Sequence, residues 1–122
     1  MTIQLVLEKE SGKLWGRVSY NENLIVDSAT TLQALEKKFR KLLKDFHQLE
    51  DVKFDYAYDL TVFFEEFSFL NQSKIAELSG INASLLRQYA SGVKNPSEVQ
   101  AKKIQTAIRE LAVRLKNVQI YA

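Results

Sequence analysis

The segment from Gln72 to Pro96 constrains the fold more than any other part of the chain. It reads QSKIAELSGINASLLRQYASGVKNP, the layout of two short helices joined by a tight turn and followed by a loop that contains a glycine. Ala76 is the small residue that lets the second helix cross the first, and Gly80, four positions later, accepts the positive φ angle of the turn. The segment therefore predicts a helix-turn-helix, in which the second helix has the size and shape that enter the DNA major groove.

The apolar residues of this segment predict which side of each helix is buried. Leu86 should point back into the core with Tyr89 three positions further on, and four aliphatic residues should complete that core: Ile75, Leu78, Ile81 and Leu85. The side chains that remain on the outer face of the second helix are Ala83, Ser84, Arg87 and Gln88. Small residues near the helix start permit close approach to base edges, and Arg and Gln can make the paired hydrogen bonds that read guanine and adenine.

Phosphates of the DNA backbone should be contacted by residues that flank this outer face. Asn71, Gln72 and Ser73 lie at the start of the first helix, where unpaired backbone N–H groups and the helix dipole favour an anion. Ser91 and Lys94 lie just past the second helix. Such contacts position a protein on DNA without reading its sequence. The alternative is a helical hairpin that binds no DNA. Ala and Gly are common at helical positions, so their presence also fits such a hairpin.

The first part of the chain has the period of about two residues that is typical of β-strands. Apolar and polar residues alternate in segments that begin at Ile3 and Leu14, and a third strand begins at Leu24. Ser11-Gly12 and Asn21-Glu22-Asn23 separate these segments and contain residues that tolerate the left-handed backbone of tight turns. Three strands joined by two turns are therefore predicted.

A helix and a fourth strand should follow. Thr30 with Gln33 three residues later matches a capping box. The apolar residues after Thr30 recur every three or four positions on one face: Leu32, Leu35, Phe39, Leu42, Leu43 and Phe46. The opposite, mostly basic face is compatible with a membrane or a partner, but is more typical of a solvated helix packed on a sheet. Alternation from Val52 to Tyr58 predicts the fourth strand.

These elements predict an α+β fold in two domains. Residues 1–58 should form a small βββαβ unit of sheet and helix, and residues 59–122 an all-helical helix-turn-helix domain. The net charge is only +2, but from Leu70 to Ala122 eight Lys and Arg face three acids, a net charge of +5, so Met1 to Phe69 carry −3. The split indicates two modules with different partners, the alternative being ordinary solvated surface.

Composition excludes several classes of protein. The absence of cysteine rules out disulfides and thiolate metal sites, and no apolar run reaches transmembrane length. We therefore expect a soluble, cytoplasmic protein without a membrane partner.

A long final helix should begin at Asn95-Pro96-Ser97-Glu98, with Asn95 as its cap, and run to about Asn117. Its apolar residues form a heptad-like seam that includes Ile104, Ile108, Leu111, Leu115 and Val118. Part of the seam should close the helix-turn-helix core. The remainder predicts a homodimer, extended by strand pairing of the segment from Val118 to Tyr121. Two recognition helices would then lie about one DNA turn apart, roughly 34 Å, on a palindromic operator.

No catalytic, metal or cofactor site is predicted. Asp27, Asp55 and Asp59 are the carboxylates that could hold Mg²⁺ in a ribonuclease-like centre, but Asp59 suits a helix cap better. His47 is the only histidine, so a zinc site would lack a second ligand of that kind. The sequence contains neither a P-loop nor a GxGxxG motif. We therefore expect that the protein is not an enzyme.

The stretch GINASLLRQYASGVKNPS resembles the Xre/Cro family of repressor helix-turn-helix domains. That family often has a Gly, an aliphatic residue and a capping residue before the recognition helix, and a Gly-basic-Pro-Ser stretch after it. The resemblance extends over residues 60–115. It implies base contacts at Ala83, Ser84 and Gln88, and phosphate contacts near Asn71, Gln72 and Ser91.

Across both halves the chain is similar to the HicB antitoxin family, whose N-terminal part is a truncated ribonuclease-H-like fold. The hairpin strands around Leu14-Trp15-Gly16 and the segment SATTLQALEKKFRKLL carry this likeness, whereas the short YNENLIVD replaces a Pro-Asp-Leu-Pro-Gly-like loop. The resemblance implies the antitoxin of a type II toxin-antitoxin pair. Such a protein neutralises a small HicA-like, mRNA-cleaving toxin and represses its own operon as a dimer or dimer of dimers.

The acidic first half is compatible with a basic toxin through electrostatic complementarity. The alternative is a stand-alone Xre-type transcription regulator, whose first half senses a ligand or only oligomerises.

Overall fold

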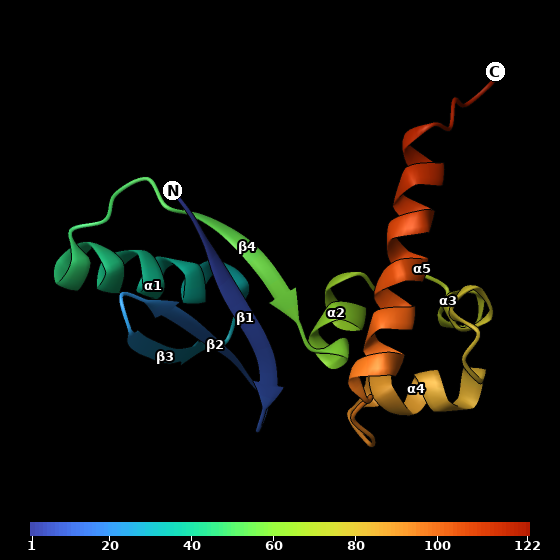
Figure 1. The fold of residues 1–122 in the computed structure, drawn as a ribbon, viewed down its shortest axis with the longest axis horizontal. Helices are drawn as coiled ribbons and strands as arrows, with labels where there is room; N and C mark the ends of the chain where they lie inside the picture. The colour runs from blue at the N-terminus through green and yellow to red at the C-terminus, as the bar shows by residue number, and fades with distance from the viewer. The chain divides into compact units, whose positions relative to one another are not determined.

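The chain forms two compact units, Met1–Phe63 and Phe64–Ala122, in a computed structural model that describes residues 1–122 (Figure 1). The elements in chain order are β1 (Thr2–Glu10), β2 (Lys13–Tyr20), β3 (Asn23–Ala29), α1 (Leu32–His47), β4 (Lys53–Tyr58), α2 (Leu60–Glu66), α3 (Gln72–Ser79), α4 (Ala83–Ser91) and α5 (Glu98–Lys116). The predicted α+β class is confirmed. The first unit ends within α2, beyond the boundary at residue 58 that the sequence predicts. None of the helices combines the length and the apolar character needed to span a lipid bilayer.

One mixed sheet with the strand order β3-β2-β1-β4 forms the first unit together with α1 (Figure 1). β1 pairs antiparallel with β2, and β2 pairs antiparallel with β3. β4 pairs parallel with β1, with Ile3 opposite Phe54. The parallel pairing is possible because α1 carries the chain from one edge of the sheet to the other. β3 and β4 are therefore the two edge strands.

Two residues in left-handed conformation close each hairpin. Ser11 and Gly12 join β1 to β2 with φ angles of 53° and 76°, and Asn21 and Glu22 join β2 to β3 with φ angles of 51° and 65°. Short turns with positive φ angles match the right-handed twist of the paired strands. Both turns lie where the sequence predicts them, although Asn23 already belongs to β3.

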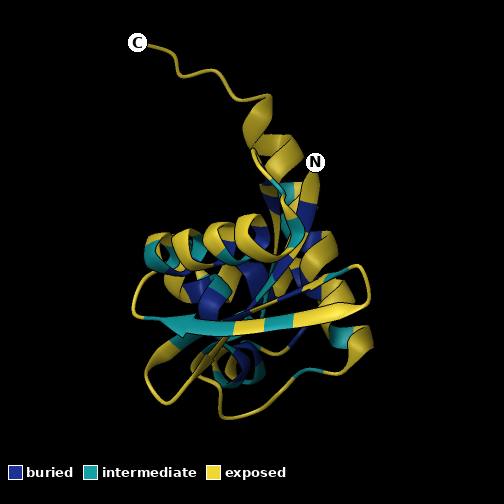
Figure 2. Cartoon of the chain, turned by 90° about the vertical axis from the view of Figure 1, so that its left-hand side faces the viewer, coloured by how far each residue is buried: buried dark blue, intermediate teal, exposed yellow.

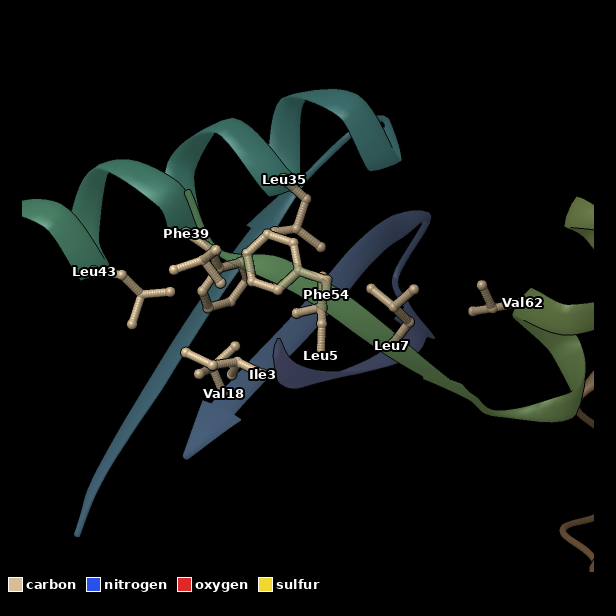
Figure 3. Close-up of a cluster of buried hydrophobic side chains, with 10 residues drawn as sticks. Ile3, Leu5, Leu7, Val18, Leu35, Phe39, Leu43, Phe54 and Val62 are labelled. Atoms are coloured by element: carbon tan, nitrogen blue, oxygen red, sulfur yellow. The ribbon is translucent and has the colours of Figure 1, made fainter. Parts of the chain in front are cut away.

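The core of the first unit lies between α1 and one face of the sheet (Figure 3). Its completely buried side chains include Leu5, Leu7, Leu35, Phe39 and Leu43. Phe46 departs from the apolar face predicted for α1, because 70% of its surface is exposed. It lies in the last turn of the helix beside edge strand β3, where no further strand covers it.

Gly16 on β2 marks a very close approach of α1 to the sheet. A Cβ atom added there would lie 2.7 Å from Cε2 of Phe39, 2.9 Å from Cδ2 of Leu35 and 3.1 Å from Cδ1 of Leu5. Since real Cβ atoms essentially never have contacts below 3.0 Å, only glycine allows the helix to pack at this distance.

We predict that Gly16→Ala lowers the free energy of unfolding by about 1–3 kcal/mol, because an extra methyl group would overpack this core. Urea denaturation followed by circular dichroism measures the change. Ser19→Ala alters an exposed position of the same strand and should leave the midpoint nearly unchanged. Equal midpoints for both variants would show that α1 does not pack this closely.

Two predicted helix caps are displaced along the chain. Thr31 rather than Thr30 caps α1, because its Oγ1 accepts the N–H three residues later at 3.2 Å. Ser97 rather than Asn95 caps α5, because its Oγ likewise accepts the N–H three residues later at 3.2 Å. A capping oxygen must sit directly before the first helical residue to reach that N–H. Asp59 caps α2 as predicted, since its Oδ1 accepts the N–H three residues later at 2.8 Å.

Candidate nucleic-acid interface

A left-handed residue at Gly80 forms the turn between α3 and α4. Its φ angle is 69°, and its N–H donates to the carbonyl of Glu77 at 3.2 Å. The next N–H, that of Ile81, donates to the carbonyl of Ala76 at 3.0 Å. This pair of bonds satisfies carbonyls at the end of α3, and the buried side chain of Ile81 holds the chain as it leaves the helix.

Asn82 caps the start of α4. Its Oδ1 accepts the N–H groups of Ser84 and Leu85 at 2.8 and 3.3 Å, so one side chain satisfies two donors of the first turn. The resemblance to repressor domains implies a capping residue at this place, and an Asn directly before a helical pattern is the sequence signal of such a cap.

One side of α4 is buried. Leu86 is completely buried and Tyr89 is 6% exposed, in agreement with the sequence prediction. α4 packs against α3, whose Ile75 and Ala76 are also buried. The small side chain of Ala76 therefore lies in the core of this helix pair, as predicted.

The sequence predicts Leu78 in the same core, but Leu78 is 43% exposed. The buried positions of α3 are Ile75, Ala76 and Ser79, and Leu78 lies on the flank of that face. There it lines a shallow groove together with Val99 of α5. Leu85 is half-buried, so it contributes only part of its side chain to the core.

The outer side of α4 carries the four predicted base-contact residues. Ser84 and Arg87 are exposed, whereas Ala83 and Gln88 are half-buried. Positions three or four apart share one face of a helix, so residues 84, 87 and 88 form a continuous polar surface. A capped helix of nine residues thus has one anchored apolar side and one accessible polar side.

The predicted phosphate contacts at the start of α3 have different exposures. Asn71 is the cap of α3, and its Oδ1 accepts the N–H of Lys74 at 3.1 Å. Ser73 is exposed and Gln72 is half-buried. The oxygen of Asn71 is therefore held by its own helix, and its amide nitrogen is the group that can donate to a phosphate.

The predicted phosphate contacts after α4 lie close together. Ser91 is the last residue of α4 rather than a residue past it, and its Oγ donates to the carbonyl of Gln88 at 3.2 Å. Gly92, with a φ angle of 82°, ends the helix. Lys94 follows, and its backbone N–H also donates to the carbonyl of Gln88, at 3.2 Å. The side chain of Lys94 is exposed.

The predicted seam on α5 has two parts. Ile104 is 1% exposed and belongs to the core of the second unit, so it is not available to a second copy as the seam requires. Ile108 and Leu111 are half-buried, whereas Leu115 and Val118 are 60% and 55% exposed. α5 ends at Lys116, so Val118 lies beyond the helix. The exposed end of α5 is visible in Figure 2.

The carboxylates considered for catalysis lie on separate elements. Asp27 is on edge strand β3, where Lys38 Nζ lies 3.6 Å from its Oδ1. Asp55 is on β4, at the opposite edge of the sheet. Asp59 is engaged as the cap of α2. The chain contains no group of three or more His, Cys, Asp or Glu side chains that could hold a metal ion.

Comparison of the chain with protein-family models, with curated proteins and with solved structures finds no match. The candidate interface consists of α4, capped at its start, with a buried side that anchors it and a polar side that faces solvent.

We predict that Asn82→Ala lowers the free energy of unfolding of the second unit by about 0.5–2 kcal/mol, because two N–H groups at the start of α4 lose their acceptor. Thermal unfolding of the intact chain and hydrogen exchange of the α4 amides measure this loss. Asn95→Ala is the matched control, since Asn95 is also exposed and precedes a helix that Ser97 caps. If the two variants behave alike, Asn82 does not hold the helix start.

Proposed function

We propose that the second unit binds DNA in a sequence-dependent manner through α3 and α4. The observation that carries this proposal is the division of α4 into two sides, with Leu86 and Tyr89 buried and Ser84 and Arg87 exposed. A helix anchored along one side by apolar residues is rigid enough to present its other side to base edges.

In this proposal the start of α4 enters the major groove. Ala83 and Ser84 are short, so they allow the helix backbone to approach the bases. Arg87 can donate two hydrogen bonds to O6 and N7 of guanine, and the amide of Gln88 can pair with N6 and N7 of adenine. These residues supply the sequence preference.

Residues on either side of α4 hold the phosphates and fix the register of the domain on the duplex. The proposed set is Asn71, Gln72, Ser73, Ser91 and Lys94. Lys94 contributes charge, whereas the others contribute uncharged donors near helix ends. Because phosphate contacts release counterions, binding should weaken as salt concentration rises.

We predict that Arg87→Ala or Gln88→Ala weakens binding to the preferred duplex by about 1–3 kcal/mol and relaxes the base preference at one position. The intact chain first selects the duplex from a random pool, and fluorescence anisotropy at fixed salt then measures Kd. Arg109→Ala removes an exposed arginine from α5 and is the matched control, expected to leave base preference unchanged. Selection of no sequence, or unchanged preference in all three variants, would rule out α4 as the reading helix.

The same proposal includes a two-fold homodimer formed by the last turns of α5. Leu115 and Val118 expose most of their apolar surface, and Ile108 and Leu111 are only half-covered by their own chain. A second copy would remove this surface from water. The two α4 helices would then read half-sites of a palindromic operator about one DNA turn, or roughly 34 Å, apart.

We predict that Leu115→Asp abolishes this dimer, because it places an unpaired carboxylate in an apolar contact. Ile108→Asp should act in the same way, but Ile108 also packs within its own unit, so Leu115 gives the cleaner test. Sedimentation velocity measures the mass in solution. Val99→Asp introduces the same charge at an exposed position in the first turn of α5 and should leave the mass unchanged; a mass unaffected by Leu115→Asp contradicts the seam.

We further propose that the protein is a HicB-like antitoxin that acts in the cytoplasm. In support, the elements β1, β2, β3, α1 and β4 precede the helices in the order that a truncated ribonuclease-H-like domain would have. Met1 to Phe69 carry a net charge of −3, and two of these negative charges, on Glu65 and Glu66, lie beyond the first unit. The first unit is therefore only slightly acidic, which is compatible with a small, basic, mRNA-cleaving HicA-like toxin. The first unit would block the toxin, and the second unit would repress the operon that encodes both.

Purification of the tagged intact chain from its native cell tests the antitoxin proposal. We expect a small basic protein to come with it and to lose ribonuclease activity in the complex. If DNA binding is found but no such protein is bound, the chain acts instead as a stand-alone transcription regulator.

A further inference from the structure

Edge strand β3 carries few of the features that usually protect the edge of a sheet, and Lys38 of α1 covers only its end, where Nζ donates to the carbonyl of Ser28 at 2.7 Å. Lysine, proline and bulges are the common safeguards against pairing with another strand, and the sequence NLIVDSA contains neither Lys nor Pro. Its only charge, on Asp27, is already paired with Lys38. Leu24 and Val26 on this strand are 63% and 52% exposed. The opposite edge strand, β4, carries exposed Lys53 and Asp55.

Ile25, between Leu24 and Val26, faces α1 and packs against the core. A groove of about 530 Å³ lies between residues 23–26 of the strand and the side chains of Leu42 and Phe46. Phe46 is the exposed residue of the apolar face of α1. Figure 2 shows β3 at the front of the first unit, with exposed and half-buried residues along it.

We propose that β3 pairs antiparallel with β3 of a second copy of this chain, so that two four-stranded sheets join into one of eight strands. An isologous contact of this kind needs a surface that complements itself. If both α1 helices lie on the same face of the joined sheet, the two-fold axis must place one residue of β3 opposite itself, because opposed residues of antiparallel strands point to the same face.

The residue pattern of β3 selects Ile25 as that central residue. With Ile25 opposite itself, apolar Leu24 lies opposite Val26 of the second copy, and the Asn23 amide lies opposite the Asp27 carboxylate. Centring on Val26 would place Ile25 opposite Asp27, and centring on Leu24 would place Asn23 opposite Ile25. Only the Ile25 register matches apolar with apolar and polar with polar.

Charge favours the same arrangement. Glu22 lies in the turn before β3, whereas the ammonium group of Lys38 lies near its end, 2.7 Å from the carbonyl oxygen of Ser28. In an antiparallel two-fold pair, the start of β3 with Glu22 lies near the end of β3 of the second copy with Lys38. The symmetry produces this contact at both ends of the strand pair. The grooves of the two copies also meet along the axis, so that Leu42 and Phe46 gain apolar neighbours.

Sedimentation velocity of the intact chain tests the pairing with Val26→Lys, because a lysine on an edge strand opposes its extension. The variants are compared in the Leu115→Asp background, so that the α5 contact does not hold two chains together. Leu115→Asp alone should contain two chains, and the addition of Val26→Lys should leave one. The addition of Gln4→Lys, an exposed position on central strand β1, should leave two. A single chain for Leu115→Asp alone, or a mass unchanged when Val26→Lys is added to it, overturns the proposal.

An introduced cysteine tests the register, since the chain has none of its own. Opposed residues of antiparallel strands have Cα atoms about 4.5 or 5.5 Å apart, which is within the span of a disulfide. Ile25→Cys should therefore form a covalent dimer under mild oxidation, and Gln4→Cys should not. Equal and slow crosslinking of the two variants overturns the Ile25-centred pair.

Discussion

The burial of one side of α4 is the interaction on which the candidate interface depends. Leu86 and Tyr89 pack α4 against the rest of its unit, so the polar residues on the opposite side of the helix face solvent. The two ends of the helix reinforce this orientation, with Asn82 satisfying donors at its start and Gly92 ending it in a left-handed conformation. The polar surface is therefore a consequence of the packing, because a helix without fixed contacts would rotate and would not keep the same side chains toward solvent.

Features that depend on neighbours in sequence could be predicted well. Gly80 was identified because a left-handed turn needs such a residue, and Leu86 because helical spacing relates it to the rest of the small core. Cap positions could not be predicted in the same way, since two residues that can cap a helix stand at each place, and only the first helical residue selects between Thr30 and Thr31.

Burial that depends on distant elements could not be predicted. Phe46 has the spacing of a core residue, yet it is exposed because the sheet ends at β3. Leu78 lies on the flank of α3, and Ile104 is enclosed by its own unit rather than left for a second copy. In the candidate site, sequence could identify the outward polar residues of α4 and a capping residue before them, but not that one oxygen of Asn82 would accept two N–H groups of the first turn.

Gly16 imposes a further condition on how this chain can change. The ring of Phe39 fills the space between the sheet and α1 that a side chain at position 16 would need. A larger residue at position 16 therefore fits without loss of stability only if a smaller one replaces Phe39 or Leu35 in the same step or earlier. Among descendants of this sequence, position 16 should vary together with position 35 or position 39. The distance between α1 and the sheet should change only when residues on both elements change.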